Sequence, residues 1–270
     1  MSFTAFALAH GVLINHLHTD GRIRRVPTAD HAKSRNGAYK FTGEWGWVQD
    51  WANHAEPIIF RPDHVPVEVV RRDMAAERRA EQQRRENAAK LAGQIIARCS
   101  FDEHPYLIRK GFPFAKTLVD TDGRMVVPMR DVTNYKRVNS VQFIAEDGTK
   151  KFLPGGQAKG SVLIRGTGSE HWLCEGFATG LSIEQALASM YRQARVVVCF
   201  SAGNLAHVAS LIGGRRFVIA DNDVSATGAR YAALTGLPWA MPDVVGQDAN
   251  DLFQARGVRA VVDLMRSAMR

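Results

Sequence analysis

The chain has 270 residues, of which 46% are hydrophobic, enough apolar material for one core and for a second, smaller one. No apolar run approaches the roughly 20 residues that span a bilayer, and the first ten residues lack the basic start and apolar block of a signal peptide, so the sequence predicts a cytoplasmic protein without membrane contact. The formal net charge of +8 favours a polyanionic partner such as nucleic acid.

Residues 1–62 are predicted to form a small, β-rich N-terminal domain. The stretches 38–41 and 45–48 alternate in polarity and are flanked by glycines, which is typical of short strands joined by turns. Basic residues are interleaved with aromatic residues: Arg22, Arg24, Arg25, Lys33, Arg35 and Lys40 among Tyr39, Phe41, Trp45, Trp47 and Trp51. This composition suits single-stranded nucleic acid, whose bases stack on rings and whose phosphates meet cations. Burial of the aromatic residues in a small core is the alternative.

Residues 63–99 are predicted to form a long charged linker helix. The segment follows the prolines at 62 and 66 and is dense in Ala, Glu, Arg and Gln, all strong helix formers. Opposite charges recur three or four residues apart, as in Glu81 with Arg84 and Arg85. A solvated spacer is the favoured interpretation, and contact with DNA is the alternative.

Residues 100–168 are predicted to form a small α+β subdomain. A short helix is expected at 104–110 and strands at 124–129 and 138–143. The dipeptides Asp122-Gly123 and Asp147-Gly148 stand between strand-like runs, which is a hairpin signal.

Residues 169–270 alternate short apolar runs with helical stretches. Strands are expected at 172–174, 195–200 and 217–220, and helices at 180–190, 205–212, 228–235 and from about Val258. This alternation predicts βαβ units, hence an α/β fold with a parallel sheet flanked by helices.

Three carboxylates follow two of these strands. Glu175 comes after the first strand, and Asp221 and Asp223 come after the third. If those strands are neighbours, the three side chains meet at the carboxyl edge of the sheet, where α/β proteins place ligands. Carboxylates suit Mg²⁺, and paired metals stabilise both oxygens of a phosphoryl transfer. Gly176 would let a phosphate approach the backbone, and Gly180 would open a helix whose N-terminus favours an anion.

The ordered motifs resemble the TOPRIM domain of phage- and plasmid-type DNA primases. They are Glu175 to Ile183 (EGFATGLSI), Ser201 to Leu205 (SAGNL), Ala220 to Asp223 (ADND) and Gln247 to Leu252 (QDANDL). The resemblance implies a TOPRIM domain over 169–270 with a central, mostly parallel sheet. It also implies catalysis by Glu175, Asp221 and Asp223 with Mg²⁺ or Mn²⁺. Asp248 and Asp251 would add metal contacts or cap a helix, and Glu175 would be a ligand or a general base; these alternatives remain open.

A second resemblance lies upstream. Residues 126–131, 147–156 and 159–160 are similar to the basic subdomain that precedes TOPRIM in bacterial-type primases. The resemblance implies that Arg130, Lys150, Lys151 and Lys159 face nucleic acid or nucleotide phosphates. Lysines after a tight turn suit that role as point charges.

The sequence departs from bacterial replicative primases in two ways. The three cysteines, Cys99, Cys174 and Cys199, form no CxxC pair, so neither a zinc ribbon nor a disulfide framework is expected, and unpaired thiols are predicted. No Walker A sequence is present, so a helicase partner, if one is needed, would act in trans.

The expected function is a DNA primase that makes short RNA primers on a single-stranded DNA template from nucleoside triphosphates. A TOPRIM-type nuclease is the first alternative, because the same metal site cleaves DNA if water replaces the 3′-hydroxyl. A non-catalytic single-stranded-DNA-binding replication accessory protein is the second.

Overall fold

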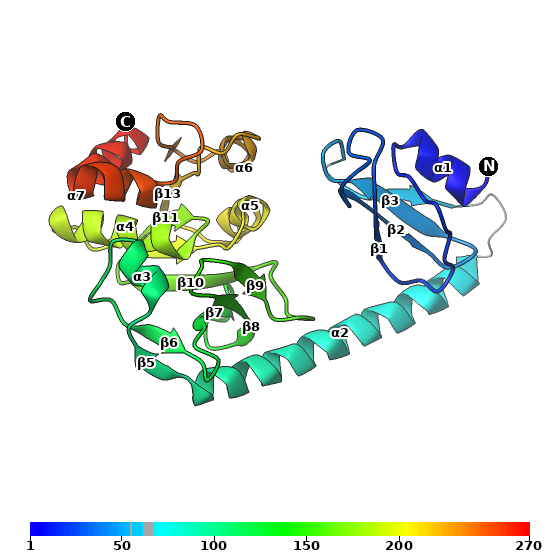
Figure 1. The fold of residues 1–270 in the computed structure, drawn as a ribbon, viewed down its shortest axis with the longest axis horizontal. Helices are drawn as coiled ribbons and strands as arrows, with labels where there is room; N and C mark the ends of the chain where they lie inside the picture. The colour runs from blue at the N-terminus through cyan, green and yellow to red at the C-terminus, as the bar shows by residue number, and fades with distance from the viewer. Residues whose placement is uncertain (55, 62–66) are drawn as a thin grey trace. The chain divides into compact units, whose positions relative to one another are not determined.

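The computed structural model describes residues 1–54, 56–61 and 67–270, with side chains of 67–75 left undescribed. The chain forms two compact units, Met1–Ala80 and Glu81–Arg270 (Figure 1). The boundary expected between residues 62 and 63 lies outside the described residues. Within the described ranges, no helix combines the length and apolarity that a membrane crossing requires.

The first unit contains a four-stranded antiparallel sheet in the order β1-β2-β3-β4. Its strands are β1 (Arg24–Val26), β2 (Gly37–Phe41), β3 (Gly46–Asp50) and β4 (Ile58–Phe60), and a helix, α1 (Phe3–Ala9), precedes them. The strands expected at 38–41 and 45–48 are therefore confirmed as β2 and β3.

Phenylalanine and tyrosine, rather than tryptophan, form the core of this unit. Phe3 stacks on Phe41 with ring centroids 4.2 Å apart, and Tyr39 is 1% exposed. Trp51 stays 39% exposed, with the Arg25 guanidinium 3.8 Å from its ring centroid. The aromatic residues thus divide between core and surface, and contact of this surface with nucleic acid remains a prediction.

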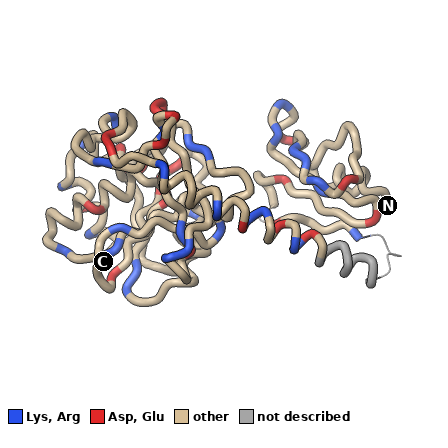
Figure 2. The backbone as a smooth tube through the Cα atoms, turned by 90° about the horizontal axis from the view of Figure 1, so that it is seen from below, with Lys and Arg blue, Asp and Glu red and all other residues tan. Residues whose placement is uncertain are grey.

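The predicted charged helix is confirmed as α2 (Val67–Arg98). Glu81 pairs with Arg85 one turn away, as the charge spacing predicted. Figure 2 shows blue and red positions close together along its described part. In the second unit, Ala88 and Ala92 are buried against strands of the sheet, so this end of the helix is part of the core.

The second unit is built on a ten-stranded sheet. Its main path runs β14-β13-β11-β12-β10-β7-β6-β5, with β8 paired to β7 and β9 paired to β8. The strands are β5 (Ser100–Asp102), β6 (Thr117–Val119), β7 (Met125–Asp131), β8 (Val138–Ile144), β9 (Lys150–Phe152), β10 (Ser161–Gly166), β11 (Glu170–Cys174), β12 (Arg195–Val198), β13 (Arg215–Ile219) and β14 (Trp239–Ala240).

The ten-stranded sheet as a whole is only partly parallel, and its parallel part lies in 169–270, where a mostly parallel sheet was expected. The strands after residue 169 pair in parallel, β11 with both β12 and β13, and β13 with β14. β10 pairs antiparallel with β12 and with β7. Because β10 joins both groups, the strands of 100–168 and those of 169–270 form one continuous sheet.

Helices cover both faces of the parallel strands (Figure 1). On one face α4 (Phe177–Ser189) and α7 (Ala249–Ala268) pack around Trp172 and Phe217. On the other, α5 (Ala202–Leu211) and α6 (Thr227–Leu234) pack on Leu173 and Val218. Successive side chains of β11 and β13 point to opposite faces of the sheet, and helices bury both faces. This explains why the apolar runs in these strands are continuous.

The expected helices differ from the observed ones at their ends, and α4 and α5 each begin three residues earlier than expected. The short helix expected at 104–110 is α3 (Pro105–Arg109), with His104 as its N-cap. The C-terminal helix begins at Ala249, not at about Val258. Gly257 interrupts it with φ 73° and ψ −178°, so the residues from 258 onward form its second half. Glycine adopts these dihedral angles without strain. The helix start expected at about Val258 therefore corresponds to this interruption inside α7 and not to the beginning of the helix.

The prediction of unpaired thiols is confirmed. Cys174 and Cys199 are free and buried in the parallel part of the sheet, and Cys99 is free and half-buried.

Candidate functional site

The site lies where two neighbouring strands end. β11 and β13 are adjacent and parallel, with Leu173 opposite Val218. Glu175 directly follows β11, and Asp221 comes two residues after β13. Because parallel neighbours end at the same edge, the fold brings both carboxylates to the carboxyl edge of the sheet. The adjacency that the sequence analysis had to assume is therefore present.

Glu175 is anchored at the beginning of α5. Its backbone oxygen accepts a hydrogen bond from Phe200 N at 2.8 Å, and its carboxylate accepts one from the Ala202 backbone N–H. Burial raises the pKa of Glu175, and repulsion from Asp223 raises it further. The Ala202 hydrogen bond and the charge of Lys150 oppose this rise without cancelling it. Glu175 is thus a desolvated carboxyl that faces a like charge.

Asp221 is the most perturbed carboxyl of the site. Burial, followed by repulsion from Glu175 and Asp248, raises its pKa to about 7, and Lys150 works in the opposite direction. Its Oδ1 atom is buried without a hydrogen-bond partner among the described residues. A buried carboxylate oxygen without a partner is costly unless a proton or a cation meets it.

The Asp223 side chain is held against the N-terminus of α6, whose N-cap residue is Ala226. Its carboxylate accepts hydrogen bonds from the backbone N–H groups of Thr227 at 3.1 Å and Gly228 at 2.7 Å, and from the Ser225 hydroxyl. Burial opposes ionisation, but these hydrogen bonds outweigh it and lower the pKa of Asp223. Asp223 therefore remains ionised, and part of its hydrogen-bonding capacity is already used.

Asp248 and Asp251 form the capping box of α7. Asp248 Oδ1 accepts from Asn250 N at 2.7 Å and from Asp251 N at 2.8 Å, and Asp251 Oδ2 accepts from Asp248 N at 3.1 Å. Helix capping was one of the two roles left open by the sequence, and both residues have it. Asp248 also lies close enough to Asp221 to raise its pKa. Metal contact by either residue stays a prediction.

The two lysines expected to act together point to opposite faces of β9. Their partners on β8 pack on different sides of the sheet. Ile144 is in the core beside Phe177 of α4, and Phe143 packs on the α2 side. Lys150 pairs with Ile144 and Lys151 with Phe143. The Lys150 Nζ atom lies 4.0 Å from where a Cβ on Gly176 would stand. Lys150 is thus beside the carboxylates, whereas Lys151 is directed to the other side.

The other two expected basic residues have different surroundings. The Arg130 guanidinium donates to the backbone oxygens of Tyr135 and Lys136 at 3.3 and 3.4 Å, in the turn between β7 and β8. Lys159 is exposed next to Gly160, whose N–H donates to the Asn204 side chain at 2.7 Å. Within the described part of the chain neither residue forms an ion pair with the site carboxylates, and their contact with phosphates remains a prediction.

Gly176 and Gly180 have roles that the sequence assigned differently. Gly176 is the N-cap of α4, so this helix opens four residues earlier than at Gly180. Gly180 lies inside α4, where a Cβ would stand 2.7 Å from Val198 Cγ2. Gly180 permits close packing of helix on strand, and the helix N-terminus near the site belongs to Gly176.

Sequence reasoning missed two residues that shape the site. A Cβ on Gly228 would stand 2.2 Å from the Asp221 backbone oxygen, so only glycine lets α6 begin this close to the Asp221 loop. The buried Asn204 side chain donates to Cys199 O at 2.7 Å and Ser161 O at 2.8 Å, tying β10 to the turn before α5. Asn204 belonged to a quoted motif, but Gly228 gave no signal, because close approach is a tertiary property.

The donor set suits a hard divalent cation in its chemistry. Asp221 has a buried oxygen without a partner in the described chain, and Glu175 faces it. The described residues nevertheless contain no group of three or more His, Cys, Asp or Glu side chains gathered closely enough to hold a metal ion. Magnesium or manganese at this edge therefore stays a proposal that rests on the orphaned Asp221 oxygen.

No protein-family model matches the chain. Three solved structures are similar to it in fold. A structure of the bacteriophage T7 lagging-strand DNA polymerase, interacting with primase domains of two gp4 subunits bound to an RNA/DNA hybrid and dTTP, contains a chain 14% identical, with TM-score 0.44 over 64% of this chain and 92% of that one. The primase fragment of the bacteriophage T7 primase-helicase protein is 14% identical, with TM-score 0.44 over 62% and 75%. The DnaG catalytic core is 16% identical, with TM-score 0.38 over 71% and 72%. These likenesses concern the fold alone.

Proposed function

We propose that the protein is a DNA primase that synthesises short RNA primers on single-stranded DNA by metal-dependent nucleotidyl transfer. The observation that supports this most directly is the pair Glu175 and Asp221 at the ends of two adjacent parallel strands, each with a raised pKa. Perturbed carboxyls gathered at the ligand-binding edge of an α/β sheet are typical of catalytic sites. The same residues belong to the TOPRIM-like motifs, and this resemblance is the reason for proposing nucleotidyl transfer at this edge.

Asp221, Asp223 and Glu175 would hold Mg²⁺ or Mn²⁺. When bound, such a cation stabilises negative charge on phosphoryl oxygens and lowers the pKa of an attacking hydroxyl. Asp221 would coordinate the cation through its Oδ1 atom, which has no hydrogen-bond partner in the described chain. Asp223 would coordinate it through the carboxylate lone pairs that its hydrogen bonds to the start of α6 do not use. Glu175 would act as a further ligand or as the base that takes the proton of the 3′-hydroxyl. Glu175→Gln separates these roles, because an amide oxygen can still coordinate a metal but cannot accept the proton.

Lys150 would bind the triphosphate of the incoming nucleotide. It lies beside Gly176 and works against the raised pKa values of both Glu175 and Asp221. A mobile ammonium next to carboxylates balances their charge when the site is empty and can turn to a phosphate when nucleotide arrives. The template would be single-stranded DNA, and a replicative helicase, if needed, would act in trans.

The test is primer synthesis on a single-stranded template with labelled ribonucleoside triphosphates and Mg²⁺ or Mn²⁺, with products resolved on a gel. We expect chelator-sensitive oligoribonucleotides from the parent chain and none from Asp221→Ala. Asp243→Ala is the matched control, because Asp243 is exposed and lies on the loop before α7. Full product from Asp221→Ala would refute the assignment of this site.

The same reaction distinguishes the alternatives. One outcome is that the parent chain shortens a labelled DNA strand without nucleotides and Asp221→Ala leaves it intact. That result would assign the site to DNA hydrolysis, the nuclease alternative, and not to primer synthesis. Salt-sensitive DNA binding with neither product at any metal concentration would indicate a non-catalytic accessory protein.

A further inference from the structure

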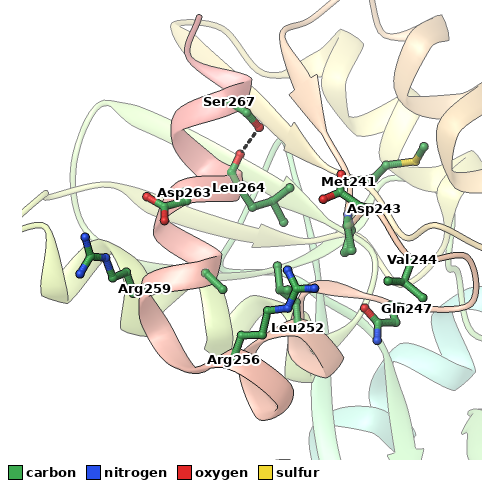
Figure 3. A pocket seen from close by; sticks show the side chains of 12 residues that line it. Met241, Asp243, Val244, Gln247, Leu252, Arg256, Arg259, Asp263, Leu264 and Ser267 are labelled. Carbon is green, nitrogen blue, oxygen red and sulfur yellow. Dashed lines mark hydrogen bonds between the residues drawn. The ribbon is translucent and has the colours of Figure 1, made fainter.

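Two cavities border α7, and they differ in charge. The first has a volume of about 540 Å³ and is lined by Arg256 and Arg259 together with Asp243 and Asp263 (Figure 3). The second, of about 610 Å³, lies between the end of α4 and the second half of α7. Arg192, Arg259 and Arg266 line it, and no carboxylate is among its described lining residues. The second cavity is therefore the one that suits an anion.

Tyr191 stands at the wall of this second cavity in an unusual conformation. It follows the C-cap of α4 with φ 53°, a left-handed position that helices normally fill with glycine. Its side chain is 98% exposed, the largest exposure among the large hydrophobic and aromatic side chains described. A bulky ring that is both strained and fully exposed contributes no burial to folding, and its faces are open to a ligand.

The three arginines differ in how far they are already engaged. Arg192 is held by Glu170, and Arg266 pairs loosely with Asp263 at 3.5 Å. Arg259 is exposed and forms no ion pair within the described part of the chain. The floor between them is apolar, from Val262 and Met269. An exposed aromatic ring, the unpaired Arg259 with the loosely paired Arg266, and apolar lining residues are the components of a site for bases and phosphates.

We propose that this cavity, defined by Tyr191, Arg259 and Arg266, binds single-stranded DNA. A base stacks on the Tyr191 ring, and flanking phosphates pair with Arg259 and Arg266. The chain's net charge of +8 agrees with such a partner. An acidic peptide would satisfy the arginines but would leave the exposed ring without a stacking partner, so DNA is the better occupant.

The cavity is separate from the carboxylate edge. The carboxylates lie at the start of α4, whose N-cap is Gly176, and Tyr191 lies beyond its end. A 13-residue helix is about 20 Å long, so the two places are separated by roughly that distance. That the bound strand is the template rests on the proposed function; the binding itself does not.

The test is the affinity of the full chain for a fluorescently labelled oligodeoxynucleotide, measured by anisotropy in chelator, so that no catalytic activity is needed. We expect Tyr191→Gly to bind about tenfold more weakly, the loss of one stacked base. Glycine suits the left-handed position, so the variant is expected to fold at least as stably, and thermal unfolding checks this. Tyr191→Phe keeps the ring and should bind like the parent.

Matched controls separate the site from general effects. Arg259→Ala should weaken binding and reduce the slope of log Kd against log salt by about 0.7, the value for one phosphate contact on a single strand. Arg256→Ala removes another exposed arginine of α7, one that lines only the first cavity, and it should change binding less. Phe114→Ala removes a 90% exposed ring outside the cavity and should leave the affinity unchanged.

Three outcomes would overturn the proposal. One is equal affinity of Tyr191→Gly and the parent. Another is equal loss from Phe114→Ala and Tyr191→Gly. The third is dependence on Tyr191 that appears for an RNA strand or a polyglutamate competitor but not for DNA. Because all measurements are made in chelator, none depends on whether primers are synthesised.

Discussion

At the scale of single residues, the decisive feature is a carboxyl that the fold makes costly. Asp221 is buried near Glu175 and Asp248, with an oxygen that has no partner in the described chain. Folding alone does not favour such a group. The folded protein already contains the repulsion among these carboxylates. A cation that binds there relieves the repulsion and is therefore bound more tightly.

Asp221→Asn should therefore stabilise the metal-free protein while abolishing primer synthesis. The folded-state pKa is about 7 against an ordinary value of 3.8, so the penalty develops as pH rises between these values and is complete above about pH 7. We expect a gain of up to about 4 kcal/mol in the free energy of unfolding at pH 8 and little gain near pH 4. Urea unfolding in chelator measures both. Asp243→Asn, on an exposed loop, should shift stability by less than about 0.5 kcal/mol. A destabilised Asp221→Asn protein at pH 8 would contradict this account.

The two neighbouring lysines of β9 should differ in kinetics. Lys150 lies beside the carboxylates and Lys151 on the other face of the strand. If primer synthesis is observed, Lys150→Ala should raise the KM for nucleoside triphosphate by about tenfold, since a charge-assisted contact of roughly 1.5 kcal/mol is lost. Lys151→Ala is the matched control and should change this KM less than threefold. Equal effects of the two substitutions would mean that β9 presents both lysines to the nucleotide.

Glu170 illustrates a buried charge that serves the fold. Its carboxylate accepts hydrogen bonds from Trp172 Nε1 at 2.7 Å and from Arg192 Nε at 2.8 Å. Burial opposes ionisation, but these bonds and the charge of Arg192 outweigh it and lower the pKa of Glu170. The ionised form is therefore the stabilising one. Its contribution is present above the ordinary pKa of about 4.5 and is lost as pH falls through the lower folded-state value.

Glu170→Gln should lower the free energy of unfolding by about 1–3 kcal/mol near pH 7. The difference from the parent should shrink as the pH is lowered below the ordinary value of 4.5, because the parent then loses the same charge. Urea unfolding at both pH values gives the comparison. Glu184→Gln is the control, since Glu184 pairs with Arg165 at a side-chain exposure of 35%, and it should cost less than about 1 kcal/mol. A difference that grows on acidification would rule out this explanation.

At the scale of elements, close approach of a helix to a strand decides where glycine is required. Gly180 in α4 faces Val198 and Val196 of β12, at 2.7 and 3.5 Å from an added Cβ. Val198 is fully buried in the sheet and cannot move aside easily. Gly93 in α2 is also a helical glycine, but an added Cβ there meets nothing within 4 Å.

The two glycines should therefore respond to alanine with opposite signs. Gly93→Ala should stabilise the protein by about 1 kcal/mol, the difference in helix propensity. Gly180→Ala gains the same propensity but overpacks the core, so we expect a net loss of about 1–2 kcal/mol. Thermal or urea unfolding of the second unit measures both. Stabilisation by both substitutions would show that α4 can move away from β12 without cost.

At the scale of the whole molecule, the two compact units have separate hydrophobic cores. The core of the first unit is aromatic, with Phe3, Phe41 and Phe60 in mutual contact. The core of the second unit lies on both faces of the parallel strands. Units with separate cores tend to unfold independently.

Phe3→Ala should accordingly affect one unit alone. Phe3 is 3% exposed and packs against four other rings, so its loss should cost the first unit about 3–5 kcal/mol. Scanning calorimetry should show two transitions in the parent and a shift or disappearance of only one in the variant. A single transition that moves as a whole would show that the units unfold together.

The sequence by itself determined most of the local structure and the identity of the carboxylates. Alternating and continuous apolar runs predicted β2, β3, β7, β8, β11, β12 and β13, because burial on one or two faces leaves a direct imprint on residue order. Glu175, Asp221 and Asp223 could be chosen because they follow such runs. Helix ends were less predictable, as at Gly257, because a glycine interrupts α7 without ending it.

Only the tertiary structure decided which of these residues meet. β11 lies between β12 and β13, so Glu175 and Asp221 are neighbours although a complete βα unit separates them in the chain. Strand register turned Lys150 toward the site and Lys151 away from it, and close packing made Gly228 necessary. The physical reason is common to all three. Strand order, side-chain direction and contact distance arise from long-range packing, which local sequence patterns do not encode.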